Sequence, residues 1–194
     1  MSKAFITIVF FLMLNGCASL ESINYKGEDA GHAVLTTVLG RGSETTATYH
    51  ITIREVSGQK TYESFSYSPG NLFWGKPSDF SDSEGMGYVH VATLKPGKYE
   101  IFSWTALNNN WNATSDEFPP YQFEIKSGQT TYVGAFAFKP FRGRNFFNIS
   151  VLAGFDFVPV PNIKRDMKIA KTKESSIVDS LVINANNDTQ AETK

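Results

Sequence analysis

The feature that most restricts the fold is a series of short runs with β-strand character, separated by residues that favour turns. In the clearest run, residues 46–56, the apolar side chains Tyr49, Ile51 and Ile53 alternate with polar ones. This period of two is typical of a strand that buries one face. Further runs rich in aromatic and β-branched residues lie at 33–39, 60–67, 88–94, 99–104, 121–125, 130–138 and 146–157. The pattern predicts an all-β domain.

The connections between these runs have a defined turn chemistry. Pro96-Gly97 separates runs 88–94 and 99–104, and proline presets φ while glycine tolerates positive φ. Ser127-Gly128-Gln129 has a similar place between runs 121–125 and 130–138. Short connections of this kind favour hairpins, and hairpins pair antiparallel strands. We therefore predict an antiparallel β-sandwich of about eight strands.

The amino-acid composition of the chain changes after Pro161. Asn162 can cap a helix whose apolar residues Ile163, Met167 and Ala170 recur at helical spacing, with lysine and arginine on the other sides. We expect the apolar side to pack on the sandwich; the alternative is that the basic helix lies on anionic lipid. Residues 176–182 could form a second helix or a strand, and residues 184–194 are expected to be disordered.

The N-terminus has the layout of an export signal. A single cation, Lys3, precedes a mainly apolar run at 4–14, which is shorter than the roughly 20 residues of a membrane span. The following Leu14-Asn15-Gly16-Cys17 resembles the lipobox of bacterial lipoproteins, although Asn15 departs from the usual small residue. The resemblance implies cleavage before Cys17 and acylation of its thiol. The alternative is a plain signal peptide with an incidental cysteine.

The resemblance to lipoproteins also implies a location and an organisation of the chain. Ala18, rather than Asp, follows Cys17, which among Gram-negative lipoproteins implies the outer membrane, with the domain facing the periplasm. The lipid bilayer is then the first partner, bound through acylated Cys17. We expect a signal peptide at 1–16, a lipidated tether at 17–31, the β-sandwich at 32–160, a helical extension at 161–183 and a tail at 184–194.

Two hairpin-like segments carry a second resemblance. The segments Leu94-Lys95-Pro96-Gly97-Lys98-Tyr99 and Gly128-Gln129-Thr130-Thr131-Tyr132-Val133-Gly134 resemble those of prealbumin-like and carboxypeptidase-regulatory-like sandwiches, especially small envelope lipoproteins. The resemblance implies an Ig-like or prealbumin-like sandwich with a short C-terminal helix. It implies no activity and transfers no functional residues, because these motifs are turn chemistry.

Several chemistries find no support in the sequence. The formal net charge of −1 gives no basic stripe for nucleic acid. His32, His50 and His90 lack the close spacing of a metal site, so we expect no metal. The acidic segment 79–85 could bind Ca²⁺, but a solvated acidic loop is the preferred interpretation. No G-x-S-x-G, P-loop or H-E-x-x-H motif occurs, and we predict neither an enzyme nor a cofactor.

Two loops remain as candidate binding regions. The long connection 68–87 holds Phe73 and Trp74, and the segment 107–117 holds Trp111 next to Asn110. Aromatic rings beside amides could bind a glycan or another small ligand; alternatively these rings cap the open ends of the sandwich. We expect a membrane-anchored envelope lipoprotein that acts as a non-catalytic interaction or structural module, with an envelope protein or glycan as partner. Ligand binding through the two loops is the alternative.

Overall fold

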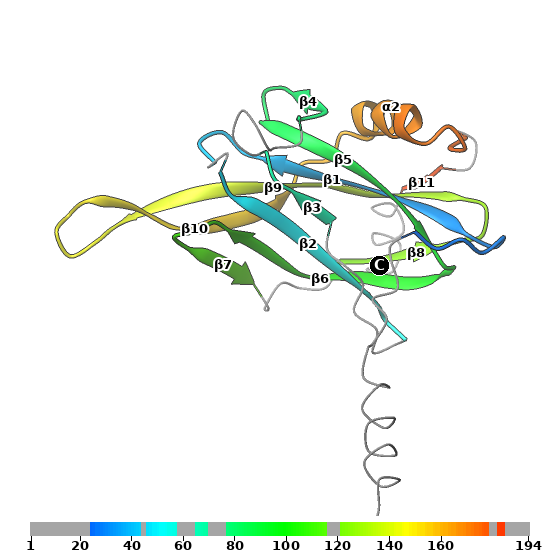
Figure 1. Cartoon of the computed structure of the whole chain (residues 1–194), viewed down its shortest axis with the longest axis horizontal. Coiled ribbons are helices and arrows are strands. Elements are labelled where there is room, and N and C mark those ends of the chain that lie inside the picture. The colour runs from blue at the N-terminus through cyan, green and yellow to red at the C-terminus, as the bar shows by residue number, and fades with distance from the viewer. Residues whose placement is uncertain are drawn as a thin grey trace, which may run out of the picture.

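The computed structural model describes residues 24–43, 46–57, 65–69, 77–115, 121–178 and 182–184. Two β-sheets face each other and one helix lies on the outside of one sheet (Figure 1), which confirms the predicted β-sandwich with a short C-terminal helix. The elements are β1 (Gly31–Leu39), β2 (Thr48–Glu55), β3 (Phe65–Tyr67), β4 (Phe80–Ser81), β5 (Met86–Leu94), β6 (Gly97–Leu107), β7 (Asn112–Ser115), β8 (Tyr121–Ile125), β9 (Thr130–Arg144), β10 (Ser150–Pro159), α2 (Ile163–Lys173) and β11 (Val182–Asn184).

The strands divide into two sheets that mix distant parts of the chain. The first sheet has the order β10-β9-β1-β5-β4, and β11 continues the β10 edge beside β9. The second sheet has the order β3-β2-β6-β7, and β8 lies beside β6. Most neighbours are antiparallel, as predicted, but β1 and β11 each pair with β9 in parallel. The central position of β1 therefore depends on a strand from the second half of the chain.

Two of the predicted hairpins are wrong. The Pro96-Gly97 turn joins β5 of the first sheet to β6 of the second, and the turn at 127–129 joins β8 to β9 across the two sheets. The turn chemistry is present, but a tight turn only redirects the chain. Burial on each side then decides which sheet the next strand joins. The predicted pairing of run 46–56 with run 60–67 is found in β2 and β3, where Tyr49 pairs with Tyr67.

The sandwich core lies between the sheets and is dominated by aromatic rings. Tyr49, Ile51 and Ile53 of β2 are fully buried, as their alternation predicted. From the first sheet, Phe136 stacks on Phe157 with ring centroids 5.1 Å apart. Each such side chain contributes about 1.5–3 kcal/mol when it leaves water. This face fixes the register of both sheets, since a shift by one residue would expose every ring.

Helix α2 forms a third layer over the outer face of the first sheet. Met167 and Ala170 pack with Val34, Val89 and Tyr132, which confirms the predicted packing of the helix on the sandwich. The helix begins at the predicted cap, where the Asn162 side chain accepts a hydrogen bond from the Arg165 N–H at 3.2 Å. Among the described residues no helix is long and apolar enough to cross a membrane.

The last predicted strand is misplaced at its start. Run 146–157 was expected to be continuous, but β10 begins at Ser150, and β9 continues to Arg144 instead of ending near 138. Residues 145–149 form the turn between them, with Asn148 at φ 60°. Phe146, Phe147 and Ile149 are aromatic or β-branched, as residues of strands often are, but they lie in this turn.

Candidate functional site

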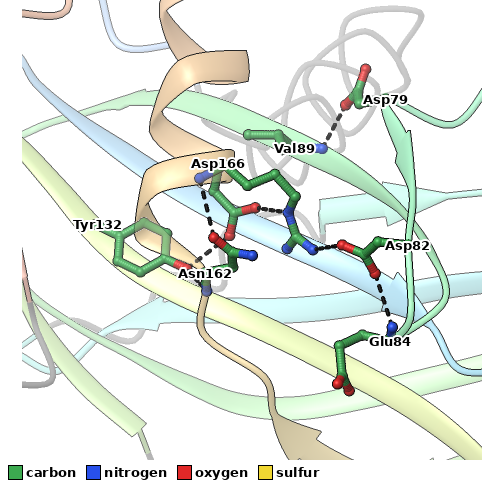
Figure 2. Close-up of polar contacts among 8 residues, drawn as sticks. Asp79, Asp82, Glu84, Val89, Tyr132, Asn162 and Asp166 are labelled. Carbon is green, nitrogen blue, oxygen red and sulfur yellow. Dashed lines mark hydrogen bonds and ion pairs between the residues drawn. The ribbon is translucent and has the colours of Figure 1, made fainter.

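A cluster of charged groups surrounds the buried carboxylate of Asp166 (Figure 2). Asp166 of α2 is fully buried and accepts hydrogen bonds from the Tyr132 hydroxyl at 2.8 Å and from Arg165 Nε at 2.7 Å. Arg165 also donates to Asp82 and lies over the Phe80 ring, 3.5 Å from its centroid. The cluster therefore connects the helix to β9 and to the segment around β4.

The electrostatics of this cluster favour a structural role. Burial, together with the charge of Asp166, raises the pKa of Tyr132, so the phenol stays protonated and donates. Burial alone would raise the pKa of Asp82. The hydrogen bond and charge of Arg165, with the Glu84 N–H, outweigh burial and hold the Asp82 pKa below its usual range. Both carboxylates thus share one guanidinium, an arrangement that positions α2.

A second ion pair anchors the other end of the helix. Lys173 Nζ donates to Asp79 at 2.6 Å and to the Val89 carbonyl at 2.7 Å, and it lies 3.5 Å from the centroid of the Tyr88 ring. Asp79 also accepts from the Val89 N–H at 2.6 Å. Residues 81–84 are exposed, in line with the preferred interpretation of segment 79–85 as a solvated acidic loop. That interpretation did not foresee that the carboxylates of Asp79 and Asp82 pair with cations of α2. Among the described residues, no cluster of His, Cys, Asp and Glu could hold a metal ion.

The three histidines lie apart and contact different partners. His90 of β5 is nearly buried, and burial lowers the pKa of His50 on β2. The ring nitrogens of His32, His50 and His90 lie within hydrogen-bond distance of the hydroxyls of Ser176, Ser66 and Thr37, respectively. These contacts give each ring a local structural role.

The structure places only part of the predicted aromatic site. Trp111 lies in the β6–β7 turn and its ring packs against Phe155 of β10, with centroids 5.3 Å apart. This is the position that the capping interpretation expects of the ring. Asn110 is exposed, and its backbone N–H donates to the Asn108 side chain at 2.8 Å. Phe73 and Trp74 lie outside the described residues, as does Cys17.

A shallow hollow of about 220 Å³ lies between residues 39–43 and 81–86. One of its lining residues, Gly85, has φ of +142° and approaches the Leu39 carbonyl so closely that a Cβ would lie 1.9 Å from its oxygen. Its lining includes two charged residues: Asp82, which is paired with Arg165, and the exposed Arg41. The other lining residues are glycine, serine or apolar, so the hollow provides few groups to hold a ligand.

The most unusual surface is a hairpin that extends beyond the sandwich. Strand β1 ends where Leu39 pairs with Phe138, whereas β9 and β10 continue as a two-stranded ribbon (Figure 1). We call residues 140–154 the distal ribbon. Its cross-strand pairs include Arg144 with Ser150 and Gly143 with Val151. Leu152 at its base still packs against the sandwich core, whereas the tip extends beyond the second sheet, as Figure 1 shows.

Large apolar side chains crowd the tip of the distal ribbon. Phe146 is 96% exposed, Phe147 76% and Ile149 58%, and the two phenyl rings meet edge to face with centroids 5.5 Å apart. The polar groups of the turn form hydrogen bonds with one another. Asn145 Oδ1 accepts from the N–H groups of Phe147 and Ile149, each at 3.0 Å, and the Asn148 N–H donates to the Asn145 carbonyl at 2.9 Å. The turn thus uses its polar groups internally and presents its apolar ones.

Behind the tip the distal ribbon is cationic on one face. Arg142 and Arg144 are its charged residues, and no acidic residue occurs between positions 140 and 154. Their guanidinium groups donate to neutral acceptors, Arg142 to Ser150 and Arg144 to Asn148. Phe141 and Val151 alternate with the arginines and are partly exposed, at 46% and 36%. Sequence reasoning missed this surface because its apolar residues resemble strand; the Asn145 and Asn148 pair was the available signal for a turn.

The comparisons with known proteins identify no family for this chain. No family model and no curated protein matches the sequence. Among solved structures, a leucine-rich repeat protein from Bacteroides thetaiotaomicron is similar at 10% identity and a TM-score of 0.36, over 57% of this chain and 14% of that protein. A "putative cell adhesion protein" from Bacteroides ovatus is similar at 10% identity and a TM-score of 0.30, over 68% and 44%. The chain thus spans less than half of either protein, and neither likeness is close enough to define a shared fold.

Proposed function

We propose that this chain is an exported lipoprotein, anchored through acylated Cys17 in the outer membrane and facing the periplasm, that acts as a non-catalytic interaction module. The observation that carries the proposal is the distal ribbon, whose exposed Phe146 and Phe147 have no counterpart elsewhere on the described surface. Monomeric soluble proteins rarely expose neighbouring large apolar side chains without a binding role. The charged cluster around Asp166 needs no catalytic role, since its groups hold α2 in place.

The start of the described chain and the tip of the distal ribbon lie at opposite ends of the sandwich. Asn24 bridges to Thr93, next to the start of β1, where the described chain begins. Because β1 and β9 run parallel, the tip of the distal ribbon lies at the opposite end of the sandwich. Six residues lie between Cys17 and Asn24, so the seven steps along the chain span at most about 25 Å when extended. A lipid on Cys17 would therefore hold one end of the domain near the membrane and leave the ribbon at the far end.

The anchor is tested by metabolic labelling with a clickable fatty acid in a bacterial host. The full chain is expected to take up label and to fractionate with membranes, whereas a Cys17→Ser variant takes up none. Release of unlabelled wild-type protein into the soluble fraction would remove the anchor from the proposal.

The interaction surface is tested separately by site-specific photo-crosslinking in cells. A photoreactive residue at Phe147 is expected to give crosslinked adducts. The matched position is Val178, which is also apolar and 52% exposed but follows α2 rather than the hairpin. Equal crosslinking from both positions, or none from Phe147, would contradict the assignment of the distal ribbon.

A further inference from the structure

We infer that the distal ribbon, at the end of the sandwich opposite to the start of β1, inserts its tip into the interfacial region of an apposed anionic lipid bilayer, not of the bilayer that would hold Cys17. The inference rests on the proposed interaction role of the ribbon and names its partner. Three properties of the hairpin carry it: the apolar tip, the internal satisfaction of the turn, and the position of the two arginines. The apolar tip corresponds to the acyl boundary of a membrane and the arginines to its phosphate layer, and the paired backbone allows the turn to leave water.

The apolar tip matches the acyl boundary of a bilayer. Phe146 and Phe147 stand almost free of the protein, so nearly their whole surface is available for transfer from water. Ile149 continues the same tip. Phenyl rings are also favoured where a membrane interface begins, because they combine large apolar area with few rotatable bonds. Full burial of one ring changes a partition coefficient by about tenfold or more.

The backbone of the turn is prepared for a medium without water. Backbone groups that enter a bilayer must find partners within the protein. The Asn145 side chain accepts from two N–H groups of the turn, and the Asn145 and Ile149 backbones are joined by a further hydrogen bond at 3.0 Å. The N–H of Asn148 is also paired. Insertion of the tip would therefore leave the N–H groups of residues 147–149 paired within the protein.

The arginines match the phosphate layer. Arg142 and Arg144 follow directly behind the tip on one face of the ribbon, and long cationic side chains of this type can keep their heads among phosphates while their stems lie in apolar surroundings. With no acidic residue in the distal ribbon, this field is entirely positive. Each cation near an anionic membrane surface strengthens binding by roughly fivefold at low salt. Along the ribbon the apolar tip comes first and the two arginines come second. A bilayer has the same order, from its acyl region to its phosphates, whereas a uniform protein groove does not.

The test uses the mature chain, residues 17–194 with Cys17→Ser, so that neither the acyl group nor the apolar run 4–14 binds lipid. Flotation is measured with vesicles of phosphatidylethanolamine and phosphatidylglycerol, and with vesicles of phosphatidylethanolamine and phosphatidylcholine. Binding to the anionic vesicles is expected, with a loss of tenfold or more for Phe146→Ser combined with Phe147→Ser. Val178→Ser, at an exposed apolar position outside the ribbon, is the matched control and should bind like the parent.

The arginines are tested by Arg142→Gln combined with Arg144→Gln. This variant should bind neutral vesicles like the parent and lose its preference for anionic ones, and added salt should have the same effect on the parent. Because all four positions are on an exposed hairpin, circular dichroism is expected to show an unchanged fold. Parent protein that fails to float with anionic vesicles, or a serine double variant that floats equally well, would overturn the inference.

The outcome also separates this inference from the function on which it rests. Crosslinking from Phe147 to a protein, with no vesicle binding, would refute the lipid partner and leave the interaction module. Crosslinking from Phe147 to lipid together with vesicle binding supports both. An absence of crosslinks and of vesicle binding would refute both.

Discussion

The Tyr132→Phe substitution tests whether the buried cluster holds α2 on the sandwich. It removes a single oxygen from a buried side chain and leaves the ring in contact with Met167 and Ala170. The lost hydroxyl donates to the fully buried Asp166 carboxylate at 2.8 Å and accepts from the Asn162 N–H at 3.2 Å. The change therefore withdraws one charge-assisted hydrogen bond and the partner of one backbone donor at the start of the helix.

The magnitude follows from the type of hydrogen bond. A hydrogen bond to a charged group contributes about 1.5–3 kcal/mol to stability, against 0.5–1.5 kcal/mol for a neutral one. Asp166 keeps its contact with Arg165, so the carboxylate is not left alone. We expect Tyr132→Phe to lower the free energy of unfolding by about 2 kcal/mol. Tyr99→Phe is the matched control, since its buried hydroxyl donates to the neutral Lys95 carbonyl at 2.7 Å, and it should cost about 1 kcal/mol.

Urea denaturation followed by circular dichroism measures both variants in the Cys17→Ser chain at neutral pH. A double-mutant cycle with Asp166→Leu then isolates the pair, because without its acceptor Tyr132→Phe should cost only the lost partner of the Asn162 N–H. If Tyr132→Phe costs no more than Tyr99→Phe, or costs the same with and without Asp166, the cluster does not hold the helix in the way described.

Three further predictions concern other parts of the fold. Gly85→Ala should destabilise by about 1–3 kcal/mol in urea denaturation, because its Cβ would strike the Leu39 carbonyl, whereas Gly42→Ala, with open space around its Cβ, should cost less. Met167→Ala should cost about 2–5 kcal/mol, measured in the same way, by opening a cavity under α2. The lowered pKa of Asp82 contributes stability above the ordinary aspartate pKa of about 4, and acid titration through its lower folded pKa should remove it; Asp82→Asn should flatten this part of the pH profile.

Much of the architecture was predictable because local physics and tertiary packing agree there. The alternation of Tyr49, Ile51 and Ile53 gave the buried face of β2 without knowledge of its neighbours. The Asn162 cap and the spacing of Met167 and Ala170 likewise predicted the beginning of α2 and its buried side. In both cases a single periodic element carries the whole signal, so no long-range pairing had to be known.

The errors arise where two distant segments decide the result. A Pro96-Gly97 turn is equally suited to a hairpin and to a crossing between sheets, and only the partners of β5 and β6 distinguish them. The pairing of Asp82 with Arg165 joins segments that no local pattern connects. The distal ribbon was missed for another reason, since strand composition at Phe146 outweighed the turn-forming asparagines beside it.

The parallel pairing of β1 with β9 has a consequence for biogenesis. Residues 31–39 lie at the middle of the first sheet, yet one of their two neighbours is a strand that the ribosome makes much later. Loop closure over such a distance slows folding. In the exported lipoprotein proposed above, the central sheet could not close until β9 had been made, and such a delay would suit a polypeptide that crosses a membrane unfolded. The order in which the strands are synthesised would thus make β9 the last neighbour of β1 to become available.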